Sequence, residues 1–121
     1  MDKLLSGRSV LVVEDEMLIF MMTEGMLVDL GCESMTAAAT VEKALGLIDE
    51  QVFDACILDM NLSGNDTHAV ADALAARGVP FVFATGYSSR ELRGQDRDRP
   101  LLRKPFLDKQ LAAIMARLLS A

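Results

Sequence analysis

Cysteine and histidine are scarce in this sequence, and their scarcity narrows the chemistry that it can carry. The 121 residues include two cysteines and one histidine. Cys32 and Cys56 stand apart from each other, so we expect neither a disulfide nor a metal–thiolate site, and two free thiols fit a reducing cytoplasm. One histidine makes neither a phosphorelay nor a metal site, and we interpret His68 as structural or solvent-facing.

Positive charge is in deficit, and no long apolar run is present. The chain has 12 basic against 18 acidic residues, a formal charge of −6. A nucleic-acid surface requires a basic patch, so we expect no nucleic-acid partner. No apolar run approaches the ~20 residues that span a membrane. The apolar stretch at residues 17–22 is shorter and follows three acidic residues, which argues against a signal peptide as well.

The remaining composition is that of one folded domain. Hydrophobic residues make up 51% of the chain, and 121 residues suffice for one domain with a real core but not for two. Residues 1–7 show no periodicity, and we expect a flexible N-terminal tail there. Residues 8–121 contain no repeat and no linker, so they are expected to form the domain.

Apolar runs and helical periodicities alternate along the domain. Strands are predicted at residues 9–13, 34–37, 54–59, 79–84 and 101–102, and helices after the first strand and at residues 41–50, 66–76 and 107–119. Residues 88–100 have only Leu92 as a large apolar side chain and are interrupted by Gly94, so the fourth helix is expected to be short or mobile. This alternation predicts an α/β fold, a doubly wound five-stranded parallel sheet with helices on both faces.

The first predicted helix is apolar on two faces. At 100° per residue, one face carries the core candidates Ile19, Met22, Thr23, Met26 and Leu30. The opposite face carries Met17, Met21, Glu24 and Val28, with Phe20 on its flank. Because methionine side chains adapt to varied partners, we interpret the outward face as a docking surface, with a wider core contact as the alternative.

Reactive side chains stand at the ends of four predicted strands. Glu14 and Asp15 follow the first strand, and Asp59, Thr85 and Lys104 end later ones. A doubly wound sheet brings these carboxyl ends to one edge. Clustered carboxylates repel one another, and a hard cation such as Mg²⁺ relieves that repulsion. Asp59 is then able to act as a nucleophile that forms an aspartyl phosphate, with Lys104 and the Thr85 hydroxyl contacting the phosphoryl group.

Taken in order, these motifs resemble the receiver domain of bacterial two-component response regulators over nearly the whole chain. The matching segments are Val10–Val13 with Glu14-Asp15-Glu16, Ile57-Leu58-Asp59, Phe83-Ala84-Thr85-Gly86 and Lys104-Pro105-Phe106. The resemblance implies a flavodoxin-like fold and a cis peptide bond before Pro105.

The resemblance also implies a function and a set of site residues. Asp59 would accept a phosphoryl group from a sensor histidine kinase or phosphotransfer protein, after which the domain switches conformation and dephosphorylates itself. Asp15 and Asp59 would bind Mg²⁺, or Mn²⁺ in its place, Glu14 through water and Asn61 through its backbone carbonyl. Gly86 and Tyr87 follow the switch Thr85, and Tyr87 and Asn61 would flank the attacking water and modulate the phosphate lifetime.

Two positions depart from the usual receiver pattern. Many receivers have proline four residues after the phosphoacceptor, where this chain has Ser63, and an aromatic residue three before the lysine, where it has Leu101. These differences resemble a subgroup whose fourth strand reads Phe-Ala-Thr-Gly-hydrophobic-Tyr, although Ser88 replaces the final Tyr here. Members of that subgroup are often stand-alone receivers paired with atypical sensor kinases.

Three other functions or origins are alternatives to this interpretation. An Asp-nucleophile phosphatase usually has a second aspartate two residues after the nucleophile, where this chain has Asn61, so we expect no enzyme activity beyond self-phosphorylation and self-dephosphorylation. A receiver excised from a larger response regulator or hybrid kinase, and a non-phosphorylated binding module, remain alternatives. We expect no output domain in this chain, a monomer or weak dimer, and a downstream protein as a further partner.

Overall fold

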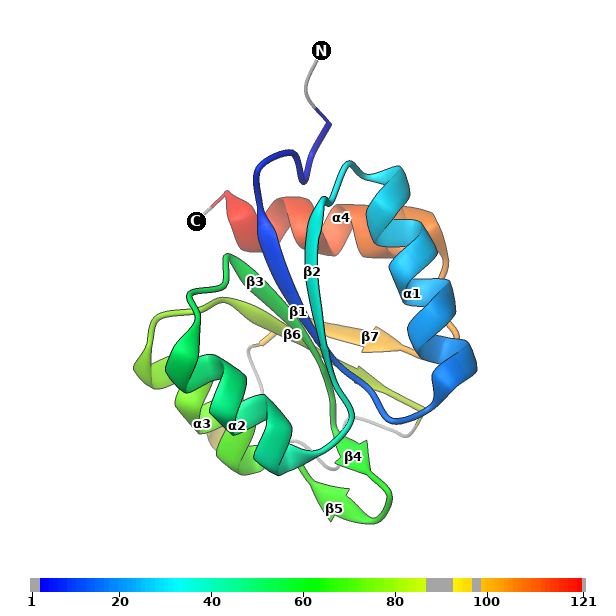
Figure 1. Cartoon of the computed structure of the whole chain (residues 1–121). Coiled ribbons are helices and arrows are strands. Elements are labelled where there is room, and N and C mark those ends of the chain that lie inside the picture. The colour runs from blue at the N-terminus through cyan, green and yellow to red at the C-terminus, as the bar shows by residue number, and fades with distance from the viewer. Residues whose placement is uncertain (1–2, 87–92, 97–98, 121) are drawn as a thin grey trace.

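A five-stranded parallel sheet forms the centre of the molecule (Figure 1). The computed structural model describes residues 3–86, 93–96 and 99–120. The strand order is β2-β1-β3-β6-β7, and all neighbouring pairs are parallel. The predicted α/β fold is therefore confirmed. The strands are β1 (Ser9–Val13), β2 (Ser34–Ala38), β3 (Ala55–Asp59), β6 (Phe81–Thr85) and β7 (Leu101–Arg103).

Two helices cover each face of the sheet. α1 (Met17–Asp29) and α4 (Asp108–Leu119) lie on one face, and α2 (Val41–Glu50) and α3 (His68–Ala76) on the other (Figure 1). Strand side chains alternate between the two cores, so that in β3 Ile57 packs toward α1 and α4 while Leu58 packs toward α2 and α3. β3 and β6 are buried along their whole length, which explains their unbroken apolar sequences.

The connection between β3 and α3 contains two short strands that the apolar periodicity does not predict. Residues 61–66 form a small antiparallel hairpin of β4 (Asn61–Leu62) and β5 (Asn65–Asp66). The hairpin takes up the residues that the helical pattern had assigned to the start of α3, which begins at His68 instead of Asp66. In contrast, α2 has the predicted bounds, and the Thr40 side chain caps it by accepting a hydrogen bond from the Lys43 N–H at 3.1 Å.

The segment expected to hold the fourth helix is partly outside the described residues, namely at residues 87–92 and 97–98, so its predicted mobility is untested. Its described part includes a short 3-10 helix, Gly94–Asp96. Asp96 is buried there, and both Arg93 and Arg99 donate hydrogen bonds to it. Arg93 also pairs with Asp72 of α3 at 2.8 Å. The apolar pattern of this segment, with Leu92 as its one large apolar side chain, gave no indication of this buried aspartate.

The N-terminal segment is anchored to the core through Leu5, although the other residues of the segment from Lys3 to Gly7 are exposed. Leu5 is fully buried among the residues beneath α1 and α4, and its N–H donates to the Leu30 carbonyl at 2.9 Å. Lys3 and Ser6 close a turn around it, since the Ser6 N–H donates to the Lys3 carbonyl. A tail that is loose up to Gly7 does not agree with this packing, because the buried side chain anchors the segment.

Helix α1 exposes more apolar surface than the sequence pattern indicated. Thr23 and Leu27 are its buried residues, whereas Met22, expected in the core, is 52% exposed. The buried face is therefore rotated away from Met22 and toward Leu27. The outward apolar face is confirmed, and its exposed large side chains are Met17, Leu18, Met21, Met22 and Val28. In the part of the chain that the structure describes, no helix has the length and apolar character that a membrane span requires.

Candidate phosphoacceptor and metal site

Three carboxylates meet at the carboxyl edge of the sheet. Glu14 and Asp15 follow β1, and Asp59 ends β3, the neighbouring strand. One oxygen atom from each carboxylate lies within 4.8 Å of the other two. Glu14 and Asp59 are buried, and Asp15 is half-buried. The structure thus brings together the three acids that the strand-end argument singled out.

Lys104 reaches into this cluster from the end of β7. Its Nζ donates to Asp59 Oδ2 at 2.9 Å and to Glu14 Oε2 at 3.0 Å, and its side chain is 10% exposed. The Lys104 N–H donates to the Thr85 carbonyl at 2.8 Å, which ties the lysine to β6. The following peptide bond to Pro105 is cis, as the family resemblance implies. The lysine is therefore held against the candidate phosphoacceptor by both backbone and side chain.

Burial and mutual repulsion shape the protonation of the cluster. Burial raises the pKa of Glu14 above its ordinary value, and the Asp59 charge adds to this, against the opposing hydrogen bonds from the Glu16 N–H and Lys104. Burial alone would lower the pKa of Lys104, but its hydrogen bonds and ion pairs with Asp59 and Glu14 outweigh this and raise it. Three acids thus face one ammonium group, which leaves an excess of negative charge.

The donor set fits a hard divalent cation. Mg²⁺ binds in proteins through a few carboxylate and carbonyl oxygens, and it retains waters or accepts phosphate oxygens. The clustered oxygens of Glu14, Asp15 and Asp59 are donors of this kind. An added divalent charge also compensates the excess that a single lysine leaves. Asn61, the predicted carbonyl donor, lies beside them, since its N–H donates to Asp59 Oδ1 at 3.1 Å.

The predicted switch residues lie next to Asp59 in the sheet. Thr85 ends β6 and is buried, and Asp59 pairs in register with Ala84 directly before it. Gly86 follows at an exposed position. Tyr87 lies outside the described residues, so its predicted influence on the phosphate lifetime stays a prediction.

Two hydroxyl groups that the sequence reasoning missed contact this site. Ser63 Oγ donates to Asp15 Oδ2 at 2.5 Å, and the buried Thr67 Oγ1 donates to the Asp59 carbonyl at 2.6 Å. Both belong to the connection after β3, for which the apolar periodicity predicts neither a strand nor, before Asp66, a helix. The signal for the hairpin was the pair Ser63-Gly64, since a serine–glycine pair marks a turn and a two-residue turn that contains glycine is typical of hairpins.

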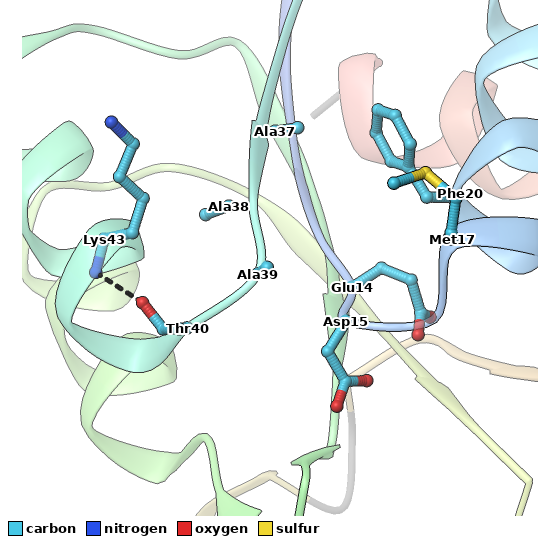
Figure 2. A pocket seen from close by; sticks show the side chains of 9 residues that line it. All are labelled: Glu14, Asp15, Met17, Phe20, Ala37, Ala38, Ala39, Thr40 and Lys43. Carbon is cyan, nitrogen blue, oxygen red and sulfur yellow. Dashed lines mark hydrogen bonds between the residues drawn. The ribbon is translucent and has the colours of Figure 1, made fainter.

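A pocket of about 410 Å³ opens beside the acidic cluster (Figure 2). Met17 and Phe20 of α1 lie on one side of it, and Thr40 and Lys43 of α2 on the other, with three alanines of the edge strand and its end between them. Beside the two carboxylates the pocket therefore has a mostly apolar lining, with Thr40 and Lys43 as its further polar residues. The lining residues are Glu14, Asp15, Met17, Phe20, Ala37, Ala38, Ala39, Thr40 and Lys43.

Comparison with known proteins agrees with this fold and site. A sequence model of the response regulator receiver domain matches residues 10–116, so the chain belongs to the receiver domain family. The solution structure of SdrG from Sphingomonas melonis Fr1 is 44% identical and covers 96% of this chain and 98% of its own, with a TM-score of 0.83. The family resemblance drawn from the motifs is thereby confirmed.

Two further relatives add information on length and metal. The phyllosphere-induced regulator PhyR of Methylorubrum extorquens is 33% identical over 115 residues, which are 91% of this chain but 43% of PhyR. The chain thus spans less than half of this curated relative. The receiver domain of the sensor histidine kinase PA1611 from Pseudomonas aeruginosa PAO1 is 27% identical, with a TM-score of 0.78 and coverage of 96% and 100%. That structure holds a magnesium ion in its active-site cleft.

The family assignment defines the class of function. A receiver domain is a signalling domain of two-component systems, not an enzyme that turns over an external substrate, and receivers interact with kinases or phosphotransfer proteins. The chain is homologous to SdrG and PhyR, and its acidic cluster agrees with phosphoacceptor signalling.

Proposed function

We propose that Asp59 accepts a phosphoryl group from a histidine kinase or phosphotransfer protein in a Mg²⁺-dependent reaction. The domain then changes conformation and returns to its resting state by hydrolysing its own acyl phosphate. The observation that carries this proposal is the contact of Lys104 Nζ with Asp59 Oδ2 at 2.9 Å inside a cluster of three acids. An aspartate held in this way has both a charge partner and neighbours that attract a metal ion.

The chemistry follows from the positions of the side chains. A carboxylate oxygen of Asp59 attacks the phosphorus of a phosphohistidine, the bond from phosphorus to the imidazole nitrogen breaks, and the nitrogen keeps the electron pair. Lys104 and the Thr85 hydroxyl stabilise the negative oxygens of the transferred group. Later attack by water on phosphorus releases inorganic phosphate and restores the carboxylate.

Glu14, Asp15, Asp59 and the Asn61 carbonyl would hold the metal ion in this scheme. Bound Mg²⁺ supplies positive charge that offsets the phosphoryl oxygens. The magnesium ion in the related PA1611 receiver and the clustered oxygens of this chain support the assignment.

The test is intact mass spectrometry after incubation with Mg²⁺ and acetyl phosphate, a small acyl-phosphate donor. Wild type is expected to gain one phosphoryl group and Asp59→Asn none. Asp49→Asn is a matched control, because Asp49 is an exposed carboxylate on α2 that pairs with Arg77 away from the site. Equal labelling of wild type and Asp59→Asn would show that the assignment of the phosphoacceptor is wrong.

A further inference from the structure

Ser63 connects the hairpin after β3 to the acidic cluster. Its hydroxyl donates to Asp15 Oδ2 at 2.5 Å, although the two residues are 48 positions apart in the chain. Asp15 stands in the loop between β1 and α1 and is more exposed than Glu14 and Asp59. A carboxylate in a loop lacks the fixed orientation that a strand or helix provides, so a contact that holds it affects how it presents its oxygens.

The backbone of the hairpin places this hydroxyl. Ser63 has φ of 51° and Gly64 φ of 90°, both in the left-handed region, and positive φ at both central residues is the two-residue hairpin turn that matches the twist of the flanking strands. The Asn61 side chain accepts from the Gly64 N–H at 2.8 Å. The adjoining Leu62 is 3% exposed in the core under α2 and α3. The turn is therefore held by two contacts: the hydrogen bond between Gly64 and Asn61, and the burial of Leu62 in the core.

The same hairpin orients Asn61. Hydrogen-bonded and non-hydrogen-bonded pairs alternate along an antiparallel ladder, and the pair beside a two-residue turn, here Leu62 and Asn65, exchanges the hydrogen bonds. Asn61, in the next pair, therefore turns its backbone groups away from β5. Its N–H accordingly donates to Asp59, and its carbonyl lies on the same side of the strand. One hairpin thus brings the Asn61 N–H to Asp59 and the Ser63 hydroxyl to Asp15.

We propose that Ser63 is a positioning residue for the metal site: its hydroxyl fixes one oxygen of Asp15 so that the other is oriented toward a divalent cation. This inference rests on the proposed function, because it concerns the same Mg²⁺ site. Carboxylates that bind metals are usually hydrogen-bonded to a second group, and loss of that group weakens metal binding about 10- to 100-fold. Ser63 stands where many receivers have proline, which has no side-chain donor.

The experiment compares two variants that lose the hydroxyl but differ in their backbone. Ser63→Gly relaxes the backbone and accepts the left-handed φ, whereas Ser63→Ala keeps a Cβ and bears the strain of positive φ. Mg²⁺ affinity is measured by isothermal titration calorimetry on unphosphorylated protein. Both variants are expected to bind Mg²⁺ at least about tenfold more weakly than wild type. Ser6→Gly is the control for the substitution itself, since Ser6 lies in an exposed turn outside the site.

A second readout separates positioning from general damage. With acetyl phosphate as donor, the Mg²⁺ concentration for half-maximal labelling is expected to rise in both variants by the factor seen in calorimetry. The rate at saturating Mg²⁺ is expected to stay at the wild-type value. A loss confined to Ser63→Gly would assign the effect to flexibility, a loss confined to Ser63→Ala would assign it to strain, and either would overturn the inference.

The outcomes also separate this inference from the proposed function. If wild type binds Mg²⁺ and is labelled at Asp59, but both Ser63 variants match its affinity, only the role of Ser63 is wrong. If wild type binds no Mg²⁺, both proposals fail.

Discussion

Glu14 is the residue whose ionisation opposes the folded state most directly in the cluster. Because burial and the charge of Asp59 raise its pKa above the ordinary 4.5, the folded protein binds its proton more tightly than the unfolded chain does. The contribution of Glu14 to stability is therefore full at low pH and falls as the pH rises through the raised pKa.

Glu14→Gln removes this ionisation. In EDTA at pH 7 the variant is expected to be more stable than wild type. The difference should vanish below about pH 4, where Glu14 of the wild type is protonated in both the folded and the unfolded state. Urea denaturation of both proteins from pH 4 to 8 measures it, and the difference between the two curves isolates Glu14 from the other acids. A wild type that exceeds the variant at pH 7 would contradict the raised pKa.

At this scale the sequence predicted the cluster but not the groups that support it. The four residues of the cluster lie at or just after strand ends: Glu14, Asp15, Asp59 and Lys104. In a doubly wound sheet the carboxyl ends of the strands lie at one edge, whatever conformation the loops adopt. The contact of Ser63 depends instead on the sign of one backbone angle. A serine before a glycine is compatible with several turns, so residue type alone did not place its hydroxyl.

Helix α1 is the element whose surface is hardest to explain by folding alone. Met17 is 69% and Met21 55% exposed, and both lie on the helix that begins just after the acidic loop. A partner that brings a phosphohistidine to Asp59 has to approach over this end of the molecule. Burial of apolar side chains on both partners would then stabilise the encounter.

Met17→Lys combined with Met21→Lys tests this surface. Phosphotransfer from the cognate kinase is expected to slow at least about tenfold, or about 1.4 kcal/mol in transition-state free energy, while labelling by acetyl phosphate is unchanged. Val52→Lys provides a matched control on the loop after α2, since Val52 is 87% exposed. If labelling by acetyl phosphate falls equally, the substitutions have damaged the fold rather than a docking surface.

The bounds of helices and strands were predicted well where the apolar pattern and the capping residues agreed. They were predicted poorly where contacts with residues distant in the sequence determine the conformation. α2 has both a clear apolar face and a capping threonine, and its bounds were correct. α3 was started too early because a hairpin took its first residues. The segment around Asp96 is fixed by Arg93, Arg99 and the pairing of Arg93 with Asp72 of α3, and no periodicity in the sequence reports an ion pair between elements.

At the scale of the whole molecule, a metal ion bound at the acidic cluster would link to folding. A ligand that binds only the folded state stabilises it by RT ln(1 + [L]/Kd), so each tenfold rise in Mg²⁺ above Kd should add about 1.4 kcal/mol to the free energy of unfolding. Urea denaturation at increasing Mg²⁺, with ionic strength held constant by NaCl, measures this. EDTA should restore the lower value, and Asp15→Ala should show a flat response. A wild type whose stability ignores Mg²⁺ would argue against the metal site.

The overall architecture was predictable because it depends on the alternation of apolar segments rather than on any one contact. Two continuous apolar strands, β3 and β6, require cover on both faces, and among the described residues four helices supply it. Such a plan tolerates errors of a few residues in each element. The arrangement of side chains around the site does not, and for that reason the fold was easier to predict than the hairpin.

The left-handed backbone of Ser63 has a consequence for how sequences of this family can change. Proline fixes φ near −65°, whereas this hairpin holds Ser63 at 51°. Ser63→Pro introduces the residue that many receivers have at this position. It is nevertheless expected to lower the free energy of unfolding, measured by urea denaturation, by more than about 1 kcal/mol relative to Ser63→Ala. It is also expected to weaken Mg²⁺ binding more than Ser63→Ala does. Equal stability of the two variants would refute this. A chain that keeps this hairpin therefore cannot accept proline at position 63 without a change in the turn.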